Sequence, residues 1–189
     1  VNTTGYSAAG SGHGFSDNGK LLINFDTTSS GTDVLVKDTT ADDDIVIVGE
    51  HGNNSGLQSG GWSIEWQGVS RNYTGATTIK EAIQKVAPSA EYSANGCSGN
   101  MNGKKAVVVV GETPYAEFKG DTDESDYRLW MTDSHKGYIN GCVEAGAQII
   151  TILVSGRVLA VEGEIKKSDA YIAAFFIGSE GDGVADFLF

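Results

Sequence analysis

The sequence predicts an α/β fold in which a mostly parallel sheet lies between helices, a three-layer α/β/α sandwich. Two observations carry this prediction. Four short apolar runs are nearly continuous and each ends in a glycine, and segments with helical periodicity lie between some of them. Continuous apolar runs indicate strands that are covered on both faces, whereas strands with one face exposed to solvent alternate apolar and polar residues. Strands that alternate with helices favour a parallel sheet with helices on its faces.

Residues 1–32 differ from the rest because they are rich in Gly, Ser, Thr, Asn and Asp. We interpret them as an irregular or hairpin-like N-terminal segment. KLLINF (20–25) and DVLVK (33–37) flank a Ser-Ser-Gly turn and make one hairpin-like pair. The sandwich domain is expected to cover residues 33–189.

The predicted strands lie within that second part of the chain. They are DIVIVG (44–49), KAVVVVG (105–111), QIITILVSG (148–156) and YIAAFFIG (171–178). Thr78 and Glu81 have the spacing of a capping box, which predicts a helix over TIKEAIQKV (78–86) that stops before Pro88.

Further helix signals complete the pattern. Thr132 is a candidate N-cap for a helix that ends at Gly146. A short helical stretch is expected over about 161–167 and a final helix over about 182–189.

Composition limits the classes of partner. The 189 residues are 40% hydrophobic, which is enough for one domain with a substantial core. The net charge is −12, from 25 acidic against 13 basic residues, so we expect neither nucleic acid nor a membrane surface as a partner. No apolar stretch approaches the roughly 18 residues that a membrane span needs. A neutral or cationic ligand fits better.

Cysteine and histidine give no metal or cofactor signal. Cys97 and Cys142 lack a zinc-ligand spacing, and two free, partly buried thiols are favoured over a single disulfide. His13, His51 and His135 are scattered, and only His51 follows a predicted strand. No cofactor and no metal are therefore predicted.

Functional side chains gather in loops that follow strands, where open parallel sheets bind ligands. SGGWSIEWQG (59–68) holds Trp62 and Trp66 around a carboxylate, and an aromatic face can stack on a sugar ring. Two core tryptophans are the simpler alternative. GETPYAE (111–117) holds Glu112 and Glu117, a pair that suits glycoside hydrolysis. From spacing alone, an acidic loop exposed to water is the favoured interpretation of this pair.

Two other loops favour structural interpretations. GSEGDG (178–183) resembles a phosphate-binding turn but lacks the lysine or ordered glycines of a nucleotide site. Arg157, in the SGR that ends a strand, is interpreted as a salt-bridge partner.

In this order the strings resemble the second domain of family 3 glycoside hydrolases, of the β-glucosidase and exo-β-glucanase type. The resemblance covers about residues 33–189 and includes DVLVKD, IVIVGEHGNNSGLQSGGWSIEWQG, TTIKEAI, VVVVGETPYAEFKGD, ITILVSGRVL and SDAYIAAFFIGSEGDGVADFLF. It implies that Glu117, rather than Glu112, is the general acid/base. It also implies that Trp66 lines the site of a second sugar unit with Trp62 nearby, and we add Tyr115 and His51 as substrate-binding candidates.

The resemblance further implies a partner domain. The family's nucleophile is an aspartate on a preceding (β/α)8 barrel, and about 250 residues would be needed to hold one. We therefore expect a retaining exo-acting β-glucosidase activity that releases terminal β-glucose from β-linked glucans or oligosaccharides only with a barrel, in cis or in trans. The alternative is a noncatalytic carbohydrate-binding or structural module. Secretion or a periplasmic location is expected from the family's habits.

Overall fold

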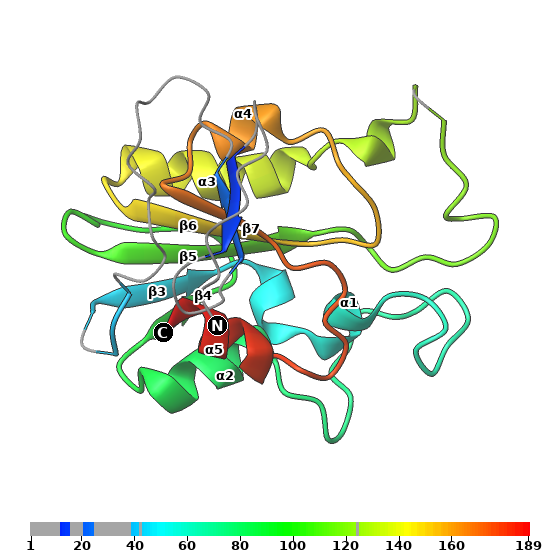
Figure 1. Ribbon diagram of the computed structural model, residues 1–189, viewed down its shortest axis with the longest axis horizontal. Helices are drawn as coiled ribbons and strands as arrows, with labels where there is room; N and C mark the ends of the chain where they lie inside the picture. The colour runs from blue at the N-terminus through cyan, green and yellow to red at the C-terminus, as the bar shows by residue number, and fades with distance from the viewer. Residues whose placement is uncertain (1–11, 16–20, 25–38, 42, 124) are drawn as a thin grey trace.

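A computed structural model describes residues 12–15, 21–24, 39–41, 43–123 and 125–189 of the protein (Figure 1). Its main sheet has five strands in the order β4-β3-β5-β6-β7, and every neighbouring pair is parallel. The strands are β3 (Ile45–Val48), β4 (Glu91–Ser93), β5 (Lys105–Gly111), β6 (Gln148–Val154) and β7 (Ala170–Ala173). The prediction of a parallel sheet is confirmed.

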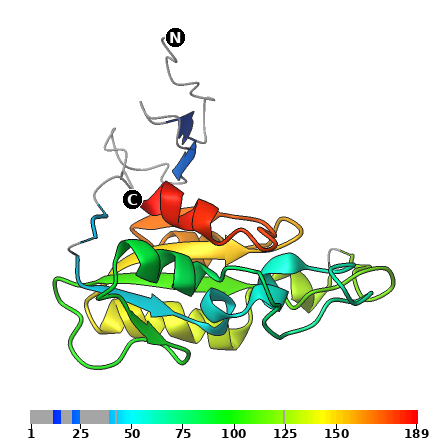
Figure 2. The ribbon, with the colours of Figure 1, turned by 90° about the horizontal axis from the view of Figure 1, so that it is seen from below.

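Helices cover both faces of this sheet (Figures 1 and 2). One face carries α2 (Ile79–Val86) and α5 (Asp182–Leu188), and the other carries α3 (Asp133–Glu144) and α4 (Glu162–Ile165). Alternate residues of β5 enter the two cores, because Val107 and Val109 pack with α2 and α5 while Val108 and Val110 pack with α3. The valine run is continuous because neither face of this strand is exposed to solvent.

The predicted helix starts are confirmed. The Thr78 hydroxyl accepts a hydrogen bond from the Glu81 backbone N–H, and the Glu81 carboxylate accepts one from the Thr78 N–H at 2.8 Å. Thr132 caps α3 in the same way through the His135 N–H at 3.3 Å. Gly146 follows α3 with a φ of 84°, a conformation that favours glycine.

Some elements were not predicted. The Asn-rich and Gly-rich stretch after β3 forms a short 3-10 helix, η2 (Glu50–Asn53), and then α1 (Ser55–Ser59). A second short 3-10 helix, η3 (Tyr127–Leu129), precedes α3, and β4 lies at an edge of the sheet. Each is too short to show a hydrophobic period.

At the N-terminus, β1 (Gly12–Phe15) pairs antiparallel with β2 (Leu21–Asn24). The expected partner of β2, residues 33–37, lies outside the described residues. Among the helices of the described part, none combines the length and the apolar character needed to cross a bilayer.

The expectation of two free thiols was wrong, because Cys97 and Cys142 form a disulfide. Cys97 lies after β4, and Cys142 lies on α3, 45 residues further along the chain. Packing of α3 against the sheet brings the two Cα atoms within 4.9 Å of each other. The pairing depends on tertiary structure, which the spacing of two cysteines does not reveal.

Candidate functional site

The candidate site lies where the order of the strands reverses. From β3 the chain moves outward to β4 and then returns to the other side of β3 to form β5. Loops that follow two such strands leave the sheet in opposite directions, which opens a crevice at their carboxyl ends. The tryptophan loop (residues 59–68) comes after β3 and α1, and the carboxylate loop (residues 111–122) begins at the end of β5.

The two loops pack backbone against backbone, which glycine makes possible. A Cβ on Gly61 would lie 2.0 Å from the carbonyl oxygen of Tyr115, and a Cβ on Gly68 would lie 2.4 Å from the Cβ of Pro114. Gln67 closes the contact, because its amide donates to the carbonyl of Glu117 and accepts from the N–H of Ala116, both at 2.9 Å. The sequence analysis did not identify Gln67, whose only signal is its place between Trp66 and Gly68.

Two indole groups converge on the carboxylate of Glu117. The Nε1–H of Trp66 donates to Oε2 at 2.5 Å, and the Nε1–H of Trp62 donates to Oε2 at 3.1 Å and Oε1 at 3.2 Å. These hydrogen bonds lower the pKa of Glu117, and the one from Trp66 has the largest effect. The carboxylate itself is exposed to water. The three residues that the resemblance singled out most strongly therefore meet, and in this structure Glu117 is ionised near neutral pH.

The aromatic rings around Glu117 face solvent. Trp62 is 68% exposed, Trp66 45% and Phe118 74%. The Trp66 ring centre lies 6.1 Å from that of Trp62 and 6.0 Å from that of Phe118. Trp62 and Phe118 have φ angles of 58° and 71°, which bulky residues rarely adopt. The simpler interpretation of core tryptophans is wrong, and Phe118 is an exposed aromatic group that the sequence analysis missed.

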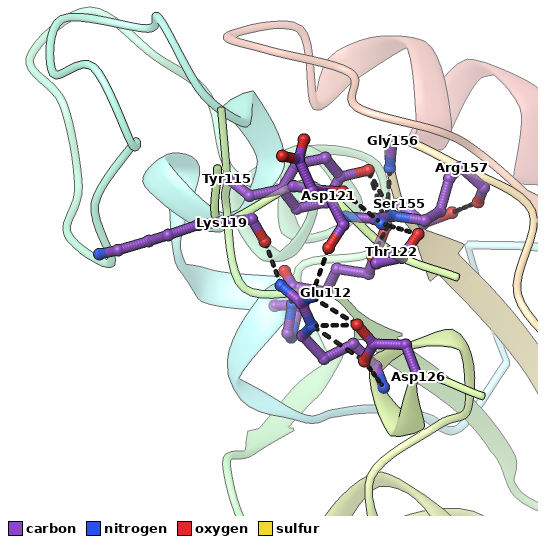
Figure 3. Close-up of polar contacts among 12 residues, drawn as sticks. Glu112, Tyr115, Lys119, Asp121, Thr122, Asp126, Ser155, Gly156 and Arg157 are labelled. Atoms are coloured by element: carbon purple, nitrogen blue, oxygen red, sulfur yellow. Dashed lines mark hydrogen bonds and ion pairs between the residues drawn. The ribbon is translucent and has the colours of Figure 1, made fainter. Parts of the chain in front are cut away.

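Glu112 has the opposite surroundings (Figure 3). Its side chain is buried, Oε2 lies 2.9 Å from Nε of Arg157, and Oε1 accepts the Gly156 N–H at 3.1 Å and the Tyr115 hydroxyl at 3.4 Å. Burial raises the pKa of Glu112, and the Arg157 charge opposes that rise. Arg157 is thus the salt-bridge partner that the sequence predicted, and Glu112 supports local structure.

Two arginines hold the carboxylate loop. Arg157 Nε donates to the Tyr115 hydroxyl at 2.8 Å, and its Nη1 donates to the carbonyl of Gly120 at 2.9 Å and to Oγ1 of Thr122 at 3.0 Å. The guanidinium carbon of Arg157 lies 3.7 Å from the centre of the Tyr115 ring, a cation–π contact. Tyr115 is therefore a support of the loop, and its contact with substrate stays a prediction.

The second arginine, Arg128, holds the far end of the loop, because it donates hydrogen bonds to the backbone carbonyls of Lys119 and Asp121.

His51 does not join these residues at the surface. Its side chain is 2% exposed, and Nε2 lies 3.1 Å from the carbonyl oxygen of Glu112, to which it donates. Burial lowers the pKa of His51 to about 4, so the ring is neutral near pH 7. His51 therefore lies in the interior of this structure, and its contact with substrate stays a prediction.

The loop at 178–183 behaves as a structural turn. Asp182 begins α5, and its carboxylate lies 2.8 Å from Nζ of Lys85 on α2. This contact joins the two helices that cover one face of the sheet. A carboxylate in the first turn also suits the helix dipole, as the sequence indicated.

Comparison with protein families decides the identity of the chain. The family described as Glycosyl hydrolase family 3 C-terminal domain matches residues 35–189. The chain belongs to this family. The resemblance inferred from the ordered motifs is thereby confirmed. No curated protein matches the chain.

Solved structures agree with this family 3 assignment. An exo-1,3/1,4-β-glucanase from a Pseudoalteromonas species is 30% identical with a TM-score of 0.72, over 85% of this chain and 21% of that chain. A β-glucosidase from Listeria innocua is 17% identical with a TM-score of 0.61, over 79% of this chain and 21% of that chain. A β-D-glucoside glucohydrolase from Trichoderma reesei is 15% identical with a TM-score of 0.55, over 77% of this chain and 24% of that chain. The last two support the fold alone. The family 3 domain thus spans less than a third of each of these chains.

Proposed function

We propose that this chain is the acid/base-donating domain of a retaining, exo-acting β-glucosidase that releases terminal β-glucose from β-linked glucans or oligosaccharides. Membership of the family 3 C-terminal domain supports a glycoside hydrolase context. The observation that carries the proposal is the convergence of the Trp62 and Trp66 indoles on Glu117 at the reversal of strand order. Glu117 protonates the departing oxygen and later activates water.

A proton donor must be protonated when it acts, whereas the indole hydrogen bonds lower the pKa of Glu117 in this structure. A domain that covers the exposed loop removes water from the carboxylate, and desolvation raises its pKa. Retention also needs a second carboxyl group about 5 to 5.5 Å away. We assign both the cover and the nucleophile to a (β/α)8 barrel, in cis or in trans, so the chain alone is expected to be inactive.

The exposed rings supply the sugar contact in this proposal. The N–H edge of Trp66 is bonded to Glu117, while the side chain keeps 45% of its surface exposed. An aromatic face buries a large area of a sugar ring with little loss of rotamer freedom. Trp66 then stacks on the sugar that departs, with Trp62 nearby, and Tyr115 positions the loop.

The test is Glu117→Gln in the enzyme assembled with its barrel. Turnover of a β-linked disaccharide is expected to fall by about 10²–10⁴, because its leaving group needs a proton. An aryl β-glucoside with an acidic phenol needs less help, so its glycosylation step is expected to be less affected. Glu91→Gln, at an exposed glutamate on β4, is the matched control. Unchanged disaccharide turnover in Glu117→Gln would contradict the proposal.

A noncatalytic carbohydrate-binding module is the second candidate, and the exposure of Trp62 and Trp66 favours it as well. Titration of tryptophan fluorescence with cello- or laminari-oligosaccharides separates the two. A saturable response in the chain alone, together with no hydrolysis after a barrel is supplied, would select the module.

We also propose that the protein is secreted or located in the periplasm. The Cys97–Cys142 disulfide supports this location, since such bonds persist in oxidising compartments. Thiol blocking before cell lysis, followed by mass spectrometry, tests it. The expected result is two cysteines that resist blocking unless a reductant is added.

A further inference from the structure

A second group of side chains, none of which belongs to the cluster of Trp62, Trp66 and Glu117, could bind a metal ion. Glu50 and His51 belong to η2, directly after β3, and His135 lies in the first turn of α3. Each residue offers one ligand atom, and these atoms all lie within 4.8 Å of one another. The two imidazole rings meet edge to face with centres 5.1 Å apart. The fold thus joins histidines that are scattered in the sequence.

The hydrogen bond of His51 fixes which nitrogen is free. A carbonyl oxygen can only accept, so the contact with Glu112 places the proton of a neutral His51 ring on Nε2. Nδ1 then carries a lone pair. Metal-bound histidines are typically oriented in this way, with the second ring nitrogen donating to a carbonyl or a carboxylate.

That lone pair is buried and has no partner. Within the described residues, Nδ1 of His51 and Nδ1 of His135 are both buried side-chain atoms without a hydrogen bond. A buried polar atom without a hydrogen bond destabilises the folded state, and native proteins rarely contain one. Two such atoms in neighbouring rings indicate that something absent from the protein chain satisfies them.

We propose that Glu50, His51 and His135 bind a divalent transition metal ion, for which Zn²⁺ is the best match. Two imidazole nitrogens and one carboxylate oxygen are ligands that zinc takes, whereas Ca²⁺ and Mg²⁺ prefer oxygen ligands throughout. The carboxylate of Glu50 balances part of the charge of the ion. This proposal departs from the sequence-based prediction of no metal. The sequence did not reveal that His51 and His135 lie side by side in the fold.

The site needs only a small adjustment to close around an ion. Zinc bonds of about 2.0–2.1 Å in a tetrahedron place neighbouring ligand atoms about 3.4 Å apart. The buried rings are already in contact, and Glu50 is exposed, so the carboxylate supplies the movement and the path of entry. Water is expected to take the fourth position on the solvent side.

Such an ion would have a structural role. It would tie the end of β3 to the start of α3, and through His51 it would reach the carbonyl of Glu112, where the carboxylate loop begins. The disulfide between Cys97 and Cys142 holds α3 at a second point further along the helix. The carboxylate of Glu117 takes no part in the metal site.

The test uses the purified chain after treatment with EDTA, without reductant, so that Cys97 and Cys142 stay paired and cannot bind metal themselves. Thermal unfolding is followed as ZnCl2, CoCl2 or MgCl2 is added, and calorimetry gives the stoichiometry. At about 100 times Kd, Zn²⁺ is expected to raise Tm by roughly 5–10 °C, and Mg²⁺ is expected to have no effect. Co²⁺ is expected to give the visible absorption of a four- or five-coordinate ion, with one ion per chain.

Variants decide whether the named residues hold the ion. Glu50→Gln, at an exposed position, is expected to weaken Zn²⁺ binding at least tenfold, and His135→Gln is expected to abolish the Co²⁺ spectrum. Glu91→Gln and His13→Gln are controls that should bind as the parent does. If His135→Gln does not fold, Glu50→Gln decides alone. The proposal is wrong if none of the ions binds, or if Glu50→Gln keeps the parent's affinity.

Discussion

Glu112 and Glu117 lie five residues apart on one loop, yet their surroundings are opposite. Glu112 is 9% exposed and faces the fixed charge of Arg157, whereas Glu117 is exposed and faces two neutral indole donors. Burial raises the pKa of Glu112, and hydrogen bonds lower that of Glu117. A carboxylate with a permanent cation is suited to hold structure, while one with neutral partners on an open surface is free for chemistry.

The largest expected effect comes from removing the cation of the buried pair. Arg157→Met leaves the Glu112 charge without its partner, and such a change costs about 3–5 kcal/mol of unfolding free energy, measured by urea unfolding. Lys166→Met is the control, because its ion pair with Glu162 is exposed and screened by water, so its loss is expected to change the stability little. Equal losses in the two variants would break the contrast between buried and exposed charges.

The Arg157→Met variant also has an expected pH dependence. Without the cation, the raised pKa of Glu112 rises further, so the folded state holds its proton more tightly than the unfolded state does. The variant therefore loses stability as the pH rises through that folded pKa. It regains this stability as the pH falls through the same pKa. Urea midpoints from pH 4 to pH 8 measure this, and a loss independent of pH would contradict it.

A smaller effect is expected where the two loops touch. Gly61→Ala places a Cβ 2.0 Å from the Tyr115 carbonyl oxygen, so the loops must separate, at an expected cost of about 1–3 kcal/mol. Tryptophan fluorescence should change as well, because the indoles lose their fixed distance to Glu117. Gly163→Ala in α4 is the control, since its Cβ meets nothing within 4 Å. No difference between these variants would show that the loops are not held by this contact.

Neutral replacements compare the two glutamates directly. Glu112→Gln is expected to cost about 1–3 kcal/mol, because the Arg157 guanidinium loses its buried charged acceptor. Glu117→Gln is expected to change the unfolding free energy much less, because its side chain is exposed to water. Urea unfolding of both variants at pH 7 measures the difference, and the reverse order would overturn the roles given to them.

The smallest effect concerns the pKa of Glu117. Trp66→Phe removes its shortest hydrogen bond, so the pKa is expected to rise toward the ordinary glutamate value, and Trp62→Phe should raise it less. A carboxyl with a depressed pKa adds stability above its unfolded pKa and loses it as the pH falls through the folded pKa. The acid limb of the stability curve should therefore flatten in Trp66→Phe. Carbon-13 NMR titration of the carboxyl group measures the shift, and an unchanged pKa would contradict this account.

The fold was largely predictable because burial leaves a pattern along the chain. The valine run of β5 and the capping box of Thr78 are local signals, and both are confirmed. The predicted strand at 171–178 was too long, because β7 ends at Ala173 and Phe175 has a φ of 58°. A change of backbone at an edge strand leaves no mark in hydrophobicity.

The site was predictable only in part. The motifs singled out Trp62, Trp66 and Glu117, but spacing alone could not separate Glu117 from Glu112, and the resemblance was needed. The disulfide and the meeting of His51 with His135 depend on how α3 crosses the sheet. Contacts between distant segments follow from topology, which no local pattern of residues encodes.

The packing of Gly61 against Tyr115 and of Gly68 against Pro114 has a consequence for protein engineering. The tryptophan loop and the carboxylate loop are separate in the chain, yet neither has room to change shape alone. Exchanging one of them with the loop of a relative should misplace both indoles, whereas exchanging the two together should preserve their geometry. The two loops should therefore be transferred between relatives together rather than one at a time.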